Sequence, residues 1–375
     1  MICAILVDDE PLALQLLSRK LRVFQDVEVV HAFSNPLFLL EKVQDLSFNI
    51  AFLDIEMPGI NGIDLAEQIL TYHPSVHIVF VSAYRDYAVQ AFELNSIDYI
   101  LKPITDDRLK KTISRIQQQL SSSPSQQLSP TEPLRIQCFS EFVVFSDHQP
   151  IKWKTAKVKE LFAFLITHHR TFINRDVLID TLWPDTDYDK AKIQLHTTLS
   201  HLRKTLQKTG HPKVITFANQ GYCLELPNFQ CDAIHLERLL IEHTKVSRDN
   251  IDLFEEAVHQ YTGDYLEQEG YEWALIHSAN LRQQMLQLMS QIVYYYEGIG
   301  DGARKQLYLN RLFQLDPYSE QALQQLLEHY IQIENRTEAI KVYHEFKERI
   351  AEELGISPSH STNALYNQIL LSDQL

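Results

Sequence analysis

The first 120 residues alternate short apolar runs with amphipathic stretches, and this alternation restricts the possible folds more than any other feature of the chain. The apolar runs are too short for helices and are bounded by polar or turn residues, which predicts strands. We expect strands at Ile2–Val7, Val27–His31, Ile50–Leu53, His77–Val81 and Asp98–Leu101, and helices near 11–24, 36–46, 62–72, 85–94 and 106–120. Such alternation predicts an α/β fold, with a parallel sheet covered by helices on both faces.

Polar side chains follow the ends of these predicted strands. Asp8 and Asp9 follow the first strand, Asp54 the third, Ser82 the fourth and Lys102 the fifth. The carboxyl ends of parallel strands meet at one edge of a sheet, so these side chains are expected to converge. Clustered carboxylates repel one another unless a cation compensates, and oxygen ligands suit Mg²⁺. One carboxylate can then attack a phosphoryl group, while the lysine adds positive charge and the serine hydroxyl can hydrogen-bond a phosphoryl oxygen.

Five short motifs occur in order along this region. They are Val7-Asp8-Asp9-Glu10-Pro11, Leu53-Asp54-Ile55-Glu56-Met57-Pro58-Gly59, Asn61-Gly62, Val81-Ser82-Ala83-Tyr84 and Asp98-Tyr99-Ile100-Leu101-Lys102-Pro103. With them, residues 1–120 resemble the receiver domain of two-component response regulators, which implies a doubly wound, flavodoxin-like fold. The resemblance implies a phosphoacceptor, Asp54; Mg²⁺ contacts from Asp8, Asp9, Asp54 and the Glu56 carbonyl; and switch residues Ser82, Tyr99 and Lys102.

A phosphatase of the D-x-D type also uses a nucleophilic aspartate near a strand end. Here Asp54 is followed two positions later by Glu56, where that motif has an aspartate. The Asp8-Asp9 pair and Lys102 have no place in that motif either, so the phosphatase interpretation is disfavoured.

Charge is distributed unevenly along the chain. Residues 1–120 contain 10 Lys/Arg and 16 Asp/Glu. Residues 121–230 contain 13 Lys/Arg and 10 Asp/Glu, and residues 231–375 contain 11 Lys/Arg and 23 Asp/Glu. Only the middle segment is basic, so contacts with nucleic acid are expected there. The Ser-, Pro- and Gln-rich segment 121–133 cannot bury a core and is predicted to be a flexible linker.

Residues 134–230 have the pattern of an α+β domain. Strands are expected at Leu134–Phe145 and Ile151–Trp153, helices near 155–168, 175–183 and 189–208, and a closing hairpin at 214–226. Helix 189–208 carries a leucine stripe, and its opposite side carries His196, Thr197, Ser200, Arg203 and Lys204. This mixture can bind phosphates and base edges, although a plain amphipathic helix explains it as well.

The segments 157–165, 178–184, 199–206 and 219–222 make this block similar to the OmpR-type winged helix-turn-helix, in the form found in SARP-type activators. The resemblance implies a recognition helix in the major groove, a wing near the minor groove and a loop at 184–189 that faces RNA polymerase. We expect His196, Thr197 and Ser200 nearest the bases, and Arg203 and Lys204 on phosphates. Asn219, Gln220 and Tyr222 belong to the wing, where Asn219 serves equally well as a turn residue.

Residues 231–375 are predicted to be all helical, with segments near 232–247, 250–261, 271–297, 302–314, 319–332, 336–353 and 361–371. Helix pairs suggest a TPR-like array without a strict 34-residue period. The segments 263–266, 272–274, 315–323 and 352–359 resemble the bacterial transcriptional activation domain of SARP-type regulators. The excess of acidic residues favours binding of proteins or self-association over DNA binding, and no catalytic motif stands out.

The sequence thus predicts a receiver domain at 1–120, a linker at 121–133, a winged helix at 134–230 and a TPR-like domain at 231–375. This multidomain protein is expected to be a non-enzymatic transcriptional regulator, with a sensor histidine kinase, promoter DNA, RNA polymerase and a second copy of itself as partners. A cytoplasmic location is expected, because the chain has no long apolar run or signal-peptide pattern and its cysteines are scattered. A phosphorylation-independent transcription factor and an interaction scaffold remain alternatives.

Overall fold

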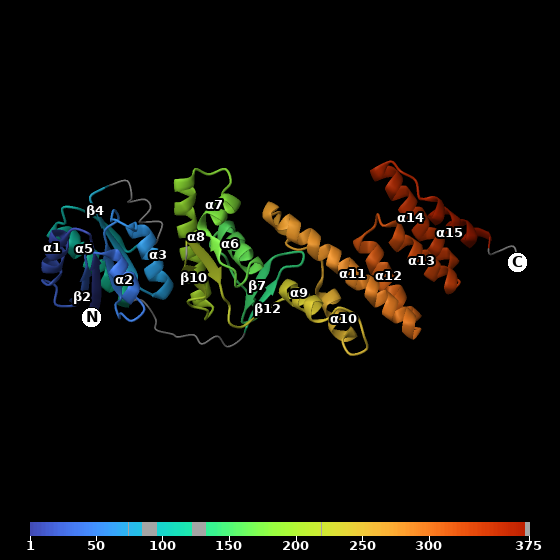
Figure 1. Cartoon of the computed structure of the whole chain (residues 1–375), viewed down its shortest axis with the longest axis horizontal. Coiled ribbons are helices and arrows are strands. Elements are labelled where there is room, and N and C mark those ends of the chain that lie inside the picture. Colours follow the sequence, from blue (N-terminus) through green and yellow to red (C-terminus); the bar gives the residue numbers. More distant parts are fainter. Residues whose placement is uncertain (74, 85–95, 122–132, 219, 372–375) are drawn as a thin grey trace. The chain divides into compact units, whose positions relative to one another are not determined.

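The computed structural model describes residues 1–73, 75–84, 96–121, 133–218 and 220–371. The chain divides into two compact units. Figure 1 shows its helices and strands coloured by their position in the sequence. The first unit contains Met1–Leu134 and Phe145–Phe229, and the second contains Arg135–Val144 and Gln230–Leu375. Within the described residues, no helix combines the length and the hydrophobicity that crossing a membrane requires.

The N-terminal part of the first unit is built on a five-stranded parallel sheet with the order β2-β1-β3-β4-β5. Its strands are β1 (Ile2–Val7), β2 (Val27–Phe33), β3 (Ile50–Leu53), β4 (His77–Ser82) and β5 (Asp98–Leu101). Its described helices are α1 (Pro11–Leu21), α2 (Pro36–Lys42), α3 (Gly62–Tyr72) and α5 (Asp106–Ser121). This order confirms the doubly wound, flavodoxin-like fold. The helix expected at 85–94 falls outside the described residues.

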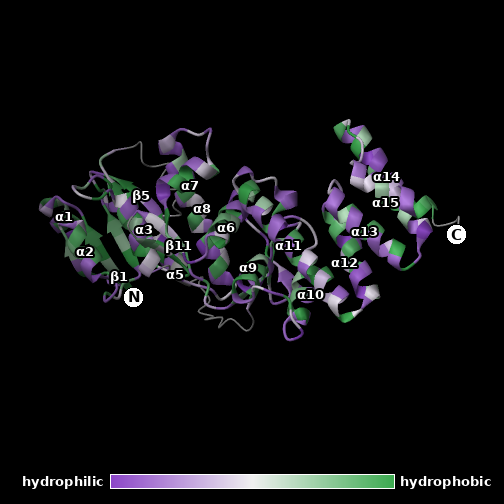
Figure 2. Ribbon diagram, turned by 45° about the vertical axis from the view of Figure 1, so that its right-hand side comes forward, coloured by the Kyte–Doolittle hydropathy of each residue, from purple (hydrophilic) through white to green (hydrophobic). Residues whose placement is uncertain are grey.

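Hydrophobic cores lie on both faces of this sheet. Alternate residues of β1 point to opposite faces: Ile5 and Val7 pack with α2 and α3, whereas Ala4 and Leu6 pack with α1 and α5. Figure 2 shows the strands as predominantly hydrophobic and the surrounding helices as mixed in hydropathy. Since both faces are covered, the strands are continuous apolar runs, as is typical of parallel sheets.

The rest of the first unit has the three helices and the terminal hairpin expected of a winged helix. The helices are α6 (Ala156–Thr167), α7 (Arg175–Leu182) and α8 (Tyr188–Lys208). The strands β9 (Ile173–Asn174), β10 (Ile215–Ala218) and β11 (Gly221–Leu224) form an antiparallel sheet in the order β10-β11-β9. The leucine stripe of α8 is buried, so this helix is held in place by its apolar face.

Two expectations for strands in this region are wrong. The expected strand Leu134–Phe145 is two strands, β6 (Leu134–Gln137) and β7 (Val143–Ser146), since Ser140 between them has a φ of 68°. Ile151–Trp153 forms no strand and follows the short β8 (Gln149–Pro150).

Part of the segment expected in the winged helix groups instead with the second unit. The Ser140 N–H donates to the Asp264 carbonyl at 2.9 Å, and the Ser140 carbonyl accepts from the Gln268 N–H at 3.0 Å. These backbone hydrogen bonds explain why Arg135–Val144 belongs to the second unit.

The second unit is mainly helical, which confirms the expected helical array. It contains β12 (Phe229–Cys231), α9 (Asp232–Glu242), α10 (Ile251–Gln260), η1 (Glu267–Glu269), η2 (Glu272–Ala274), α11 (Leu275–Ile299), α12 (Gly302–Leu315), α13 (Glu320–Gln332), α14 (Arg336–Leu354) and α15 (His360–Leu371). Successive helices pack in pairs, including α11 with α12 and α13 with α14. Side-chain caps at Asp301, Ser319 and Asn335 begin three of these helices.

Candidate functional site

A carboxylate cluster of Asp8, Asp9 and Asp54 lies at the carboxyl edge of the parallel sheet. Each residue offers an oxygen atom, and these atoms all lie within 4.8 Å of one another. Main-chain groups orient two of the side chains: the Ile55 N–H donates to Asp54 Oδ1 at 2.8 Å, and the Glu10 N–H donates to Asp8 Oδ1 at 3.0 Å. The strand ends β1 and β3 therefore bring together carboxylates that are 46 positions apart in the sequence.

Lys102 faces this cluster from the end of β5, where it precedes a cis peptide bond to Pro103. Its Nζ atom lies 2.8 Å from Asp8 Oδ2 and 3.1 Å from Asp54 Oδ2. Burial alone would lower the pKa of Lys102, but its bonds to the two carboxylates outweigh burial and raise it. Burial raises the pKa of Asp54, and the nearby ammonium offsets this only partly. The lysine thus partly neutralises a buried acidic site.

The donor set of the carboxylate cluster fits a hard divalent cation. Three carboxylates converge there, and oxygen ligands with space for water are what Mg²⁺ prefers. Glu56 follows β3 in the adjacent loop with an exposed side chain, which leaves its main-chain carbonyl as the expected contact.

Ser82 and Tyr99, the expected switch pair, are connected through the main chain of Tyr84. The Ser82 side chain is completely buried, and its Oγ accepts a hydrogen bond from the Tyr84 N–H at 3.2 Å. The half-buried Tyr99 donates its hydroxyl proton to the Tyr84 carbonyl. This role of Tyr84 could not be predicted from the sequence, because it is the main chain of Tyr84 that makes both hydrogen bonds.

Gly62 is a second residue with a structural role that was not predicted from the sequence. Its N–H donates to the Ile55 carbonyl at 2.8 Å, and a Cβ atom at this position would lie 1.9 Å from the Asp54 carbonyl oxygen. Helix α3 therefore begins directly against the phosphoacceptor candidate. The Asn61-Gly62 pair ahead of an apolar helical pattern was the available signal, since Asn61 caps the helix by accepting from the Ile63 N–H.

The structure divides the residues expected to bind DNA into several classes. Lys204 and Gln220 are exposed, Thr197, Ser200 and Arg203 are partly exposed, and His196 and Tyr222 are buried at 3% and 0% exposure. Asn219 lies outside the described residues.

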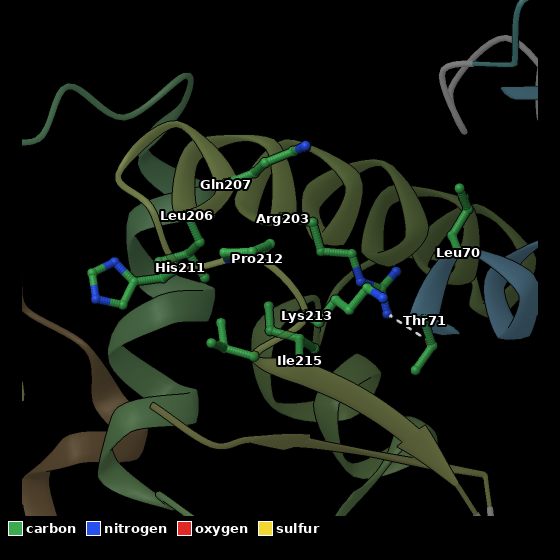
Figure 3. A pocket seen from close by; sticks show the side chains of 10 residues that line it. Leu70, Thr71, Arg203, Leu206, Gln207, His211, Pro212, Lys213 and Ile215 are labelled. Carbon is green, nitrogen blue, oxygen red and sulfur yellow. Dashed lines mark hydrogen bonds between the residues drawn. The ribbon is translucent and has the colours of Figure 1, made fainter. Parts of the chain in front are cut away.

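Helix α3 lies against this side of the winged helix, in what we call the α3 contact. It joins Asp64, Glu67 and Thr71 of α3 to Arg175, Lys192, His196 and Arg203. Glu67 Oε2 lies 2.7 Å from His196 Nδ1, and Asp64 Oδ1 lies 3.2 Å from Lys192 Nζ. Burial would raise the pKa of Glu67, but His196 and Arg203 outweigh burial and lower it to about 2. Figure 3 shows the Arg203 guanidinium reaching toward Thr71.

A second group of potential metal ligands lies in the second unit. The sulfur atoms of Cys138 and Cys231 are 3.6 Å apart, next to Asp232. The Asp232 carboxylate accepts the N–H groups of Cys138 at 2.8 Å and of Phe139 at 3.2 Å. Burial raises the pKa of the Cys138 thiol, so Cys138 is held in the protonated form.

Comparison with known proteins places three family models along the chain. Residues 4–114 match the response regulator receiver domain, residues 149–224 match the family "transcriptional regulatory protein, C terminal", and residues 232–370 match the bacterial transcriptional activator domain. The three matched domains are together those of a multidomain response regulator.

Curated relatives match about a third of this chain. An uncharacterized response regulatory protein of Vibrio parahaemolyticus is 42% identical over 134 residues, which are 36% of this chain and 55% of that protein. The transcriptional regulatory protein BtsR of Escherichia coli is 40% identical over 121 residues, 32% of this chain and 50% of that protein. The response regulator thus spans about half the length of the curated relatives it matches.

One solved structure shares the fold over a larger part of the chain. It is that of Mycobacterium tuberculosis EmbR in complex with a low-affinity phosphopeptide, with a TM-score of 0.50 and 23% identity. The match covers 64% of this response regulator and 65% of EmbR, and at this identity it shows a shared fold alone.

Proposed function

We propose that this response regulator is a DNA-binding transcriptional regulator controlled by phosphorylation of Asp54, with a sensor histidine kinase as the phosphoryl donor. One observation carries the proposal: the buried Asp54 carboxylate lies among Asp8, Asp9 and the Lys102 ammonium. A nucleophilic carboxylate surrounded by further oxygen ligands and a mobile cation is the arrangement that phosphoryl transfer requires.

In the proposed reaction, an Asp54 carboxylate oxygen attacks the phosphorus of the donor phosphohistidine. A new P–O bond forms while the P–N bond breaks, and its electron pair returns to the donor imidazole. Asp8, Asp9, Asp54 and the Glu56 carbonyl would hold Mg²⁺, which neutralises charge on the phosphoryl oxygens when bound. The Lys102 ammonium, already 3.1 Å from Asp54 Oδ2, is placed to pair with the new phosphoryl group.

Phosphorylation adds close to two negative charges beside Asp54. We propose that the Ser82 hydroxyl then hydrogen-bonds a phosphoryl oxygen, which breaks its bond with the Tyr84 N–H. Tyr99 is coupled to the same main-chain unit through the Tyr84 carbonyl, so the two side chains respond together. This chain of hydrogen bonds supports the assignment of Ser82, Tyr99 and Lys102 as switch residues.

We also propose that the winged helix binds DNA. Its residues are His196, Thr197, Ser200, Arg203 and Lys204 of α8, with Asn219, Gln220 and Tyr222 of the wing. We keep the expected domains at 1–120, 134–230 and 231–375 with a linker at 121–133, with Arg135–Val144 packed in the helical unit. We further propose that this non-enzymatic regulator acts in the cytoplasm, contacts RNA polymerase and pairs with a second copy of itself.

Labelling and DNA binding together test this function. Full-length protein with Mg²⁺ and acetyl phosphate should gain one phosphoryl group by intact mass, Asp54→Asn should gain none, and the exposed Asp45→Asn control should label normally. Binding to duplex DNA should weaken as salt rises, and the exposed Lys204→Ala should reduce the slope of log K against log salt by about one. Labelling of Asp54→Asn, or binding without salt dependence, would contradict the assignment.

A further inference from the structure

The α3 contact sets acidic side chains of the receiver domain against basic side chains of the winged helix. Glu67 and His196 are 2% and 3% exposed, which is as buried as the hydrophobic core. Around them, Asp64 Oδ1 lies 3.3 Å from Arg175 Nη1, and Glu67 Oε1 lies 3.7 Å from Arg203 Nη1. Two carboxylates thus face four basic groups across one contact.

The free energy of burying a carboxylate such as Glu67 depends on the charged groups that face it. Removal of a carboxylate from water is unfavourable unless an opposite charge replaces the lost hydration. For Glu67, His196 and Arg203 supply that compensation. If the two domains separate, water must replace these partners, so the burial of Glu67 is tied to the apposition of α3 and α8.

The basic residues that α3 covers form one face of α8. Lys192, His196 and Arg203 are spaced by four and seven positions, which places them on the same side of a helix. Cations and hydrogen-bond donors along one side of a recognition helix are the groups that contact DNA phosphates and base edges. Helix α3 therefore covers groups that DNA would need.

We propose that helix α3 holds the winged helix in a state that excludes DNA, with Asp64 and Glu67 taking the place of DNA phosphates on α8. Binding of DNA and formation of the α3 contact then compete for the same basic side chains. This inference rests on the proposed DNA-binding function and adds the means of its regulation.

The start of α3 connects this contact to the phosphoacceptor. Gly62, the first residue of α3, donates its N–H to the Ile55 carbonyl and packs directly against Asp54. Asp64 lies in the first turn of the same helix, and Glu67 follows one turn later. A phosphoryl group on Asp54 therefore acts close to the helix that covers α8, and it shifts the population toward the open state by its differential interaction with the two states.

Substitutions in α3 test the competition, because they leave every proposed DNA-binding residue unchanged. The probe is a fluorescein-labelled duplex of random sequence, titrated with unphosphorylated full-length protein. The double variant Asp64→Asn/Glu67→Gln should bind about tenfold more tightly than the original chain, as expected when a closed state of about 90% is opened. The matched control, Asp45→Asn/Glu41→Gln, removes the same charge from exposed receiver positions and should leave the affinity unchanged.

A second variant and a measurement without DNA distinguish opening of the α3 contact from misfolding of the protein. Asp64→Lys places a cation beside Arg175 and Lys192 and should open the contact by repulsion while Glu67 remains in place. Hydrogen exchange should rise in the α3 and α8 peptides of both variants. Normal phosphorylation by acetyl phosphate would show that their receiver domains are folded, and phosphorylation should no longer increase their DNA affinity.

The outcomes separate this inference from the function on which it rests. If the original chain binds DNA with salt dependence and the α3 variants bind equally well, the competition is refuted and the DNA-binding function stands. If neither the original chain nor the variants bind DNA, both are refuted. A tenfold gain confined to the α3 variants, together with faster exchange, supports the α3 contact as an autoinhibitory surface.

Discussion

A Cβ atom on Gly62 would lie 1.9 Å from the carbonyl oxygen of Asp54. No ordinary side chain fits at that distance, so the approach of α3 to the loop after β3 requires glycine. The stability of the receiver domain and the geometry of the phosphoacceptor therefore depend on the same position.

The first prediction follows from this contact. Gly62→Ala should destabilise the protein by about 2–3 kcal/mol, because the backbone of Asp54 must move to accept the methyl group. It should also slow labelling by acetyl phosphate. Urea denaturation followed by circular dichroism gives the stability. The control is Gly298→Ala in α11, where a Cβ atom meets no atom within 4 Å. Equal stabilities for the two variants would contradict the steric argument.

The second prediction concerns the charge on Asp54. Burial raises the pKa of Asp54 in the folded protein above its ordinary value of 3.8, so the ionised carboxylate costs stability at neutral pH. Asp54→Asn should raise the melting temperature at pH 7, with a gain of about 1 kcal/mol.

The sign of this effect can be checked by changing the pH. The gain should shrink as the pH falls through the raised pKa of Asp54, and it should vanish below 3.8, where the carboxyl is protonated in the folded and unfolded chain alike. The melting temperatures of the two proteins between pH 7 and pH 4 give this trend. A gain that does not change with pH would assign the stabilisation to another cause. Asp45→Asn, at an exposed position, serves as the control.

The third prediction concerns Lys102 and the divalent cation. The ammonium lies 2.8 Å from Asp8 Oδ2, so it repels a cation that binds among the same carboxylates. Lys102→Met should therefore increase Mg²⁺ affinity about tenfold or more. Isothermal titration of the two proteins with MgCl₂ measures the difference. Lys110→Met, at an exposed position on α5, should have little effect. A weaker Mg²⁺ affinity in Lys102→Met would show that the lysine organises the site instead of competing for it.

The fourth prediction concerns Asp232, which begins α9. Its carboxylate accepts the main-chain N–H groups of Cys138, Phe139 and Ala233, and Asp232→Ala would leave buried donors without partners. We expect a loss of about 2–3 kcal/mol. Asp252→Ala, an exposed residue in the first turn of α10, should cost under about 1 kcal/mol. Thermal unfolding of both variants provides the test, and similar losses would argue against a specific structural role.

The parallel sheet and its carboxylate edge could be predicted because both depend on local patterns. The strands Ile2–Val7, Ile50–Leu53 and Asp98–Leu101 have the predicted bounds, since continuous apolar runs are buried on both faces. Once the strands are parallel, their carboxyl ends must meet, and Asp8, Asp54 and Lys102 meet there. By contrast, β9 (Ile173–Asn174) was missed because two residues carry no periodicity.

The environment of the winged-helix residues could not be predicted in the same way. The pattern of α8 predicts a polar face, and a polar face is expected to be exposed. His196 is nevertheless buried and contacts Glu67, which is 129 positions away in the sequence and belongs to another domain. Periodicity within one helix holds no information on such a distant partner. The interruption of Leu134–Phe145 at Ser140 likewise reflects hydrogen bonds to residues more than 100 positions later.

The placement of α3 against α8 gives single residues two selective constraints. Any change at His196 or Arg203 that alters the preferred DNA sequence also alters the pairing with Glu67. A lineage that acquires new target genes by such changes would need compensating changes on α3 to keep a silent resting state. In a family of such regulators, positions 64 and 67 should therefore coevolve with positions 196 and 203, and an exchange of receiver domains between relatives should yield proteins that are permanently active.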